Sequence, residues 1–139
     1  MRVRDGMSDV SVTVGPSHTL RQAAKAMVDH NVGAALVIDD EAPSPGIVTE
    51  RDLLLSVGAG EDPDVETVGR HMTESVLAAA PDWSLEHAAA EMSHRGVRHL
   101  VVFEAGEVTG ILSMRDIVRV WTSAGATSEM PLPSNAGGG

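Results

Sequence analysis

Two hydroxyl–carboxylate pairs stand out among the residues of this chain that could do chemistry. Thr49 precedes Asp52 by three positions, and Ser113 precedes Asp116 by the same spacing. Each pair lies in a repeated segment, GIVTERD or GILSMRD, in which a glycine, two apolar residues and the hydroxyl residue are followed by any residue and Arg-Asp. The chain therefore places the same two side chains in the same local sequence twice.

This spacing has a structural and a binding interpretation, and the residues alone leave both open. A Ser or Thr followed three residues later by an acid can cap a helix, because the hydroxyl accepts from an amide of the first turn and the acid favours the positive end of the helix dipole. The same two groups at a helix start could instead face the vicinal hydroxyls of a ribose, since an ionised carboxylate can accept from both. Nearby amides could then face phosphate oxygens. One side chain could serve in both roles.

The segments upstream of both pairs predict a helix of the same pattern. Thr19, followed three residues later by Gln22, fits a capping box, and Ser84 is the matching cap candidate. Apolar residues then recur at i, i+3, i+4 and i+7, which is the spacing of one helix face. This face comprises Leu20, Ala23, Ala24, Met27 and Val28 in the first copy, and Leu85, Ala88, Ala89 and Met92 in the second.

Short apolar runs around these helices predict strands, so that each half has the order strand, helix, strand, strand, helix. One such unit is too small to bury both faces of its sheet, whereas two units packed through their sheets can share a core. We therefore expect an α/β (α+β) fold of two pseudo-symmetric units, residues 1–60 and 61–124, followed by a disordered tail at 125–139. The expected strands are 11–14, 35–39 and 46–49, then 75–78, 100–104 and 110–113, and the closing helices are 51–57 and 115–121.

The order of these repeated segments resembles a tandem pair of CBS domains, also called a Bateman module. The resemblance is carried by V-x-x-x-M-[ST] at 3–8 and 68–73, by NVGAALVID against GVRHLVVFE, and by the two G-apolar-apolar-[ST]-x-R-D segments. It implies binding of adenosine-containing ligands, such as AMP, ADP, ATP, S-adenosylmethionine or NAD(H), in clefts between the domains, with no required cofactor. In that family the [ST]-x-x-D pair holds the ribose, a role that falls here on Thr49, Asp52, Ser113 and Asp116.

The resemblance also suggests cleft residues around the segment that follows each long helix. Only the second copy has cations in that segment, so we expect the two clefts to differ and the cleft lined by Arg98 to accept phosphate. A guanidinium group suits phosphate geometry, although solvated charges or surface ion pairs explain the same arginines. Candidates for contact with adenine are Val32, Gly33, Ala34 and Val97, and candidates for contact with phosphate are Arg98, His99, Arg51 and Arg115.

Composition and charge argue against several other classes of protein. The net charge is −10 and Lys25 is the only lysine, which disfavours binding to nucleic acid phosphates. The chain has no cysteine, so disulfides and zinc–thiolate sites are excluded. No apolar run approaches about 18 residues, so we expect no membrane span and a cytoplasmic location.

Histidines offer one arrangement that could hold a metal ion. His87, Glu91 and His94 fall on one face of the second long helix. No HExxH motif and no fourth ligand accompany them, so a solvated polar face is the simpler interpretation and we predict no metal site. Solvent-facing positions are expected for the scattered histidines, among them His71.

The sequence predicts a binding module and no enzyme. No nucleophile, base and oxyanion donor occur together, so we predict no catalytic residues. The leading hypothesis is a non-catalytic regulatory module that binds an adenosyl ligand, signals by conformational change, forms a homodimer and acts on a protein partner. The alternative is a ligand-free structural or dimerisation module that acts through a protein partner, in which the aspartates only cap helices. The identity of the ligand and the number of filled clefts stay open.

Overall fold

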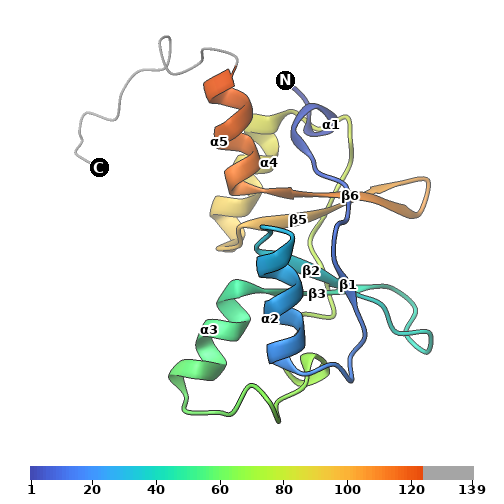
Figure 1. Cartoon of the computed structure of the whole chain (residues 1–139). Coiled ribbons are helices and arrows are strands. Elements are labelled where there is room, and N and C mark those ends of the chain that lie inside the picture. The colour runs from blue at the N-terminus through green and yellow to red at the C-terminus, as the bar shows by residue number, and fades with distance from the viewer. Residues whose placement is uncertain (124–139) are drawn as a thin grey trace.

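Two three-stranded sheets form the centre of the molecule, one from each half of the sequence (Figure 1). The computed structural model describes residues 1–123, so the tail expected at 125–139 lies outside the described residues. In each sheet the first two strands run parallel and the last two antiparallel. The strands are β1 (Thr13–Val14), β2 (Ala34–Val37) and β3 (Gly46–Thr49), then β4 (Ala78–Ala79), β5 (His99–Glu104) and β6 (Glu107–Ser113).

The helices confirm the order strand, helix, strand, strand, helix in both halves. Thr19 and Gln22 form the predicted capping box: the Gln22 amide donates to Thr19 Oγ1 at 3.1 Å, and the Thr19 amide donates to Gln22 Oε1 at 2.9 Å. Within residues 1–123, no helix combines the length and the apolar character needed to cross a membrane. The long helices are α2 (Leu20–Asp29), α3 (Glu50–Gly58), α4 (Leu85–Arg95) and α5 (Met114–Ser123), and the short turns α1 (Val3–Gly6) and η1 (Val68–Arg70) were not predicted.

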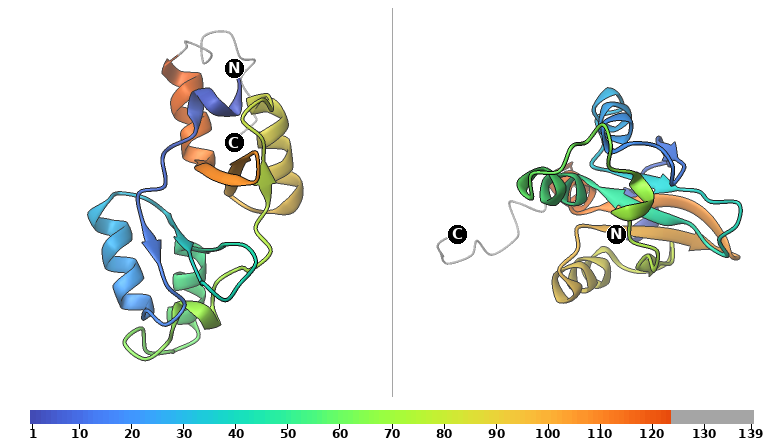
Figure 2. Two further views of the ribbon diagram at one scale, coloured as in Figure 1. Left: turned by 90° about the vertical axis from the view of Figure 1, so that its right-hand side faces the viewer. Right: turned by 90° about the horizontal axis from the view of Figure 1, so that it is seen from below.

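The two sheets pack against each other through their inner faces, as the size of each unit requires. Ala34, Leu36 and Ile47 of the first sheet meet Val101 of the second, and each of the four is at most 7% exposed. Helix α2 covers the outer face of the first sheet and α4 covers that of the second (Figure 2). This layered arrangement confirms the predicted α+β fold of two units that pack through their sheets.

The apolar face predicted for α2 is correct at its centre and wrong at its edge. Leu20, Ala23 and Met27 are buried, whereas Val28 is 77% exposed. Successive residues of a helix turn by about 100°, which places Val28 about 80° around the helix from Leu20. Val28 therefore lies outside the buried stripe and does not belong to the core.

The two units exchange their leading segments. Val3, near the start of the chain, is fully buried in the core of the second unit, and Val68 is fully buried in the core of the first. The following residues pair in the same crossed manner, because the Ser8 amide donates to the Ile111 carbonyl at 2.9 Å and the Thr73 amide donates to the Ile47 carbonyl at 2.8 Å. Helix α1 accordingly lies beside α4 and α5 (Figure 1). A boundary between residues 60 and 61 therefore divides the sequence into two repeats, but each repeat contributes its leading segment to the core of the other.

This exchange explains the glycine that opens each repeated motif. A Cβ atom on Gly46 would lie 2.8 Å from the Thr73 carbonyl oxygen, and one on Gly110 would lie 2.7 Å from the Ser8 carbonyl oxygen. Both atoms belong to backbone that is already paired with the neighbouring strand residue. Only glycine lets the leading segment of one unit lie this close to the sheet of the other.

We predict that Gly110→Ala lowers the free energy of unfolding by about 1–3 kcal/mol, because the crossing backbone must shift to admit a methyl group. Gly58→Ala is the matched control, since a Cβ there meets nothing within 4 Å. That change should be neutral or stabilising by up to about 1 kcal/mol, as alanine is the better helix former. Urea denaturation of both variants measures the difference, and equal stability of the two would contradict the close crossing.

Candidate functional site

Both hydroxyl–carboxylate pairs lie where a strand passes directly into a helix. Thr49 ends β3 and precedes α3, and its amide donates to Asp52 Oδ2 at 2.8 Å while the Asp52 amide donates to Thr49 Oγ1 at 3.4 Å. At the start of α5 the Ser113 amide donates to Asp116 Oδ2 at 2.9 Å and the Asp116 amide donates to Ser113 Oγ at 3.0 Å. The capping interpretation of the spacing is therefore correct in both copies.

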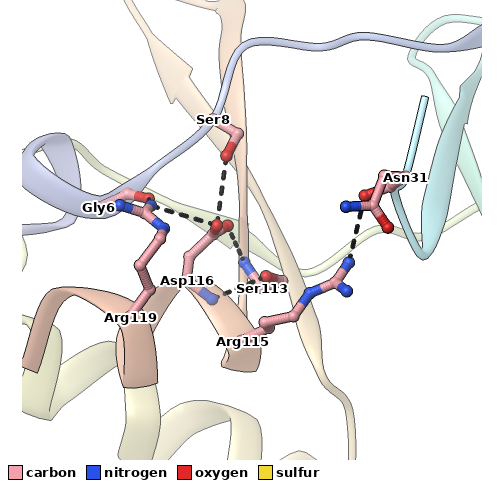
Figure 3. Close-up of polar contacts among 7 residues, drawn as sticks. All are labelled: Gly6, Ser8, Asn31, Ser113, Arg115, Asp116 and Arg119. Carbon is pink, nitrogen blue, oxygen red and sulfur yellow. Dashed lines mark hydrogen bonds and ion pairs between the residues drawn. The ribbon is translucent and has the colours of Figure 1, made fainter. Parts of the chain in front are cut away.

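Capping occupies only one oxygen of each carboxylate. The hydrogen bonds that Asp52 accepts within residues 1–123 all fall on Oδ2, including a further one from the Thr49 hydroxyl at 3.2 Å. The second oxygen of Asp116 has partners: Oδ1 accepts from Ser8 Oγ at 3.2 Å and from Arg119 Nη2 at 3.4 Å (Figure 3). The two pairs thus share their backbone geometry and differ in the partners of the second carboxylate oxygen.

The first cleft has a volume of about 300 Å³ and is shared by the two units. Ser113 and Asp116 line it from the second unit, and the segment 32–34 after α2 lines it from the first. Arg115 joins the two sides, since its Nη2 donates to the Asn31 carbonyl at 3.4 Å (Figure 3). A ligand in this cleft would contact both units at once.

The second cleft, of about 320 Å³, repeats this arrangement with the units exchanged. Thr49 and Asp52 come from the first unit, and the segment 97–99 after α4 comes from the second. Every residue predicted from the sequence to contact ribose, adenine or phosphate lines one of the two clefts. Their contacts with a ligand remain predictions.

Both clefts contain cations, although the segment after the first long helix has none. Arg115 and Arg119 line the first cleft, and Arg51 and Arg98 line the second. The reason is that each capped helix lies against the segment that follows the long helix of the opposite unit, so the arginines of the capped helix line the cleft as well. Arg119 was missed by sequence reasoning, although its position three residues after Asp116 places it on the same helix face.

His99 occupies the junction between the clefts. It lies opposite Ser113 in the β5–β6 ladder, and it lines both clefts and a third opening shared with Glu50 and Arg98. Burial lowers the pKa of His99 below its ordinary value, and the nearby carboxylates of Glu50 and Asp116 only partly oppose this effect. At neutral pH its imidazole is therefore neutral and can donate or accept a hydrogen bond, but it does not supply the positive charge that a phosphate contact would use.

The histidines differ from expectation at one further position. His71, expected to face solvent, has a side chain only 18% exposed, and its Nε2 lies 2.8 Å from Glu66 Oε1. Among residues 1–123, the side chains close enough to share a metal ion are Glu61, Glu66 and His71, and not the group on α4 considered in the sequence.

Comparison with known proteins identifies the family. Residues 3–58 and 65–123 each match the CBS domain, so the chain belongs to the CBS domain family and contains a tandem pair. An uncharacterized 17.7 kDa protein of Acidianus ambivalens is 37% identical over 108 residues, which are 76% of this chain and 64% of that protein. The chain therefore spans less than two thirds of this relative's length.

Two solved structures share the fold. One is the CBS domain pair of protein MJ0100 in complex with 5-methylthioadenosine and S-adenosyl-L-methionine. Its TM-score is 0.77 at 25% identity, and the match covers 89% of this chain and 98% of the MJ0100 chain. A hexameric CBS-CP12 protein from bloom-forming cyanobacteria has a TM-score of 0.81, also at 25% identity, over 96% of this chain and 77% of its own. Members of this fold thus include a pair bound to adenosyl compounds and a hexamer.

We predict that His99→Gln weakens the loss of stability in acid. A histidine whose pKa is lowered by folding contributes stability that is present above its unfolded pKa, about 6.5, and is lost as the pH falls below it. The wild-type chain should therefore lose more unfolding free energy than the variant between about pH 7.5 and pH 5.5. Urea titrations at both pH values provide the measurement, with exposed His94→Gln as the control for removing a histidine. An unchanged pH dependence in His99→Gln would argue against a neutral, buried His99.

Proposed function

We propose that this chain is a non-catalytic regulatory module that binds adenosine-containing ligands in the two clefts. The observation that carries the proposal is the fixed carboxylate at the start of α3, whose cap uses Oδ2 and leaves Oδ1 for the two hydroxyls of a ribose. The segment across the cleft supplies apolar Val97 for the adenine ring and Arg98 for phosphate. The adenosyl compounds bound to the MJ0100 pair support this ligand class.

The two clefts should fill with different affinity. In the cleft of Asp52, a ribose finds an oxygen to which no hydrogen bond within residues 1–123 is directed. In the other cleft, Ser8 and Arg119 already donate to Asp116 Oδ1, and a ribose must replace or share these bonds. We therefore assign the tighter site to the cleft of Thr49 and Asp52.

The signal follows from the position of the clefts between the units. A ligand that contacts both units favours the relative orientation in which those contacts are best made. The changed orientation would then alter binding to a protein partner or the state of assembly. This mechanism needs no catalytic residue, and a receptor for adenine nucleotides is expected to act in the cytoplasm.

A screen with AMP, ATP, S-adenosylmethionine and NADH tests the proposed ligand class. A ligand present at about 100 times its dissociation constant should stabilise the folded chain by about 2.7 kcal/mol, which thermal melting detects. Asp52→Asn should abolish most of this stabilisation: its amide oxygen can still accept from the Thr49 amide, but its amino group cannot accept from a hydroxyl. The matched change Asp116→Asn should have the smaller effect.

The outcome of the screen separates the proposal from its alternative. If no adenosyl compound shifts the melting temperature, or if Asp52→Asn and Asp116→Asn together leave the shift intact, the clefts do not hold a ribose through these carboxylates. The ligand-free structural module, in which both aspartates serve only as caps, would then be the better account.

Assembly into a homodimer through the capped helices is the second part of the proposal. Large apolar side chains are exposed along α3 and α5, which lie on the same side of the sheets (Figure 2). A group of large apolar side chains exposed on one side of a molecule is typical of a protein–protein interface. The exposed residues are Leu54 at 71%, Leu55 and Val57 at 58%, and Val118 at 55%.

We predict that Leu54→Glu converts the assembled protein into a monomer, because a carboxylate at the centre of an apolar interface would be buried without a partner. Val28→Glu is the matched control, since Val28 is 77% exposed on α2, on another face of the molecule. Light scattering coupled to gel filtration gives the mass of each variant. A wild-type chain that is monomeric, or a Leu54→Glu variant that keeps the wild-type mass, would contradict this interface.

A further inference from the structure

Three side chains outside the clefts come together where the first unit ends and the second begins. His71 Nε2 lies 2.8 Å from Glu66 Oε1 and 3.6 Å from Glu61 Oε1. One ligand atom from each residue lies within 4.8 Å of the other two. We propose that Glu61, Glu66 and His71 bind a divalent transition-metal ion such as Zn²⁺.

The spacing of the three atoms suits a metal ion after small side-chain movements. Zinc binds imidazole nitrogen and carboxylate oxygen at about 2.0–2.2 Å, so neighbouring ligands of a tetrahedral ion are about 3.4 Å apart. The separation of His71 from Glu61 is already near this value, and its separation from Glu66 must open by roughly 0.6 Å. Three protein ligands leave the fourth position to water.

Burial and hydrogen bonding hold the three side chains in place. The side chains of Glu66 and His71 are only 13% and 18% exposed, and that of Glu61 is 38% exposed. Glu61, the most exposed of the three, is oriented by Ser56, whose hydroxyl donates to Glu61 Oε1 at 2.6 Å. Ser56 is itself 3% exposed on α3, so this support comes from the folded core. Such a partner behind a ligand is a common feature of protein metal sites.

The charge of the group favours a cation over a purely structural ion pair. Two carboxylates face one imidazole, and within residues 1–123 no arginine or lysine lies within ion-pair distance of either glutamate. A divalent ion would balance both carboxylates at once. The imidazole favours transition metals, whereas Ca²⁺ takes six to eight oxygen ligands and Mg²⁺ prefers oxygen.

The site would connect three parts of the fold. Glu61 follows the end of α3, while Glu66 and His71 lie on either side of η1 at the entry to the second unit. The Glu66 carbonyl also accepts from the Leu20 amide at 3.0 Å, which ties this linker to the start of α2. A bound metal would therefore fasten the linker between the units to the helix that carries Asp52 at its other end.

Titration of the tag-free, EDTA-treated full chain with Zn²⁺ against a chromophoric chelator tests the site. We expect one ion per chain, and we expect His71→Gln and Glu66→Gln each to weaken binding by more than about tenfold. His94→Gln on α4 is the matched control and should bind like the wild type. Asp52→Asn should also bind like the wild type, so failure of the metal site is distinguishable from failure of the nucleotide clefts.

Two further measurements distinguish loss of metal binding from loss of folding. Circular dichroism checks each variant, and Glu61→Gln, the change at the most exposed ligand, serves if His71→Gln does not fold. Co²⁺ should give visible absorption bands of a low-coordinate nitrogen–oxygen site that vanish in the same variants. The proposal is overturned if the wild-type chain does not bind Zn²⁺ with this stoichiometry, or if folded variants at Glu61, Glu66 and His71 keep the wild-type affinity.

Discussion

The packing of two small sheets face to face is the constraint on which the rest of this structure depends. The helices of each unit cover only the outer face of its three-stranded sheet, and burial of the inner face requires the other unit. The crossed leading segments then lock the pair, because Val3 and Val68 each complete the core of the opposite unit. The clefts form along this junction, so each cleft exists only when both units are folded together.

The helix caps convert this scaffold into a pair of candidate binding sites. Reciprocal hydrogen bonds between the hydroxyl residue and the aspartate use one carboxylate oxygen and thereby fix the direction of the other. A group held in this way loses little conformational freedom when it accepts a ligand, which favours affinity. Capping and binding are therefore compatible in one side chain. The two sites differ before any ligand binds, because Ser8 and Arg119 donate additional hydrogen bonds to Asp116.

Much of this arrangement could be predicted from the sequence because the repeat presents each element twice. The long helices, the hydroxyl–carboxylate pairs and most of the strands follow from local pattern, whereas β4 shares only residue 78 with the strand expected at 75–78. The turns α1 and η1 do not follow from local pattern, since contacts with the opposite unit hold Val3 and Val68 in place. Val28 was misassigned because it lies at the edge of a helix stripe, where spacing alone does not decide burial.

The same distinction applies to the site residues. Arg119 was within reach of sequence reasoning, as helix spacing places it beside Asp116. The contact of Ser8 with Asp116 depends on how two segments far apart in the chain cross, and only the assembled pair of units brings these groups together. The approach of Glu61 to His71 depends on how the linker between the units folds back on itself, which no periodic pattern predicts.

A crystal structure of the full chain grown with saturating AMP tests whether these carboxylates hold a ribose. We expect ligand density in the cleft of Thr49 and Asp52, with the Asp52 carboxylate within hydrogen-bond distance of both ribose hydroxyls and its bond to the Thr49 amide retained. Density that places the nucleotide elsewhere, with Asp52 turned away from any sugar, would contradict this expectation.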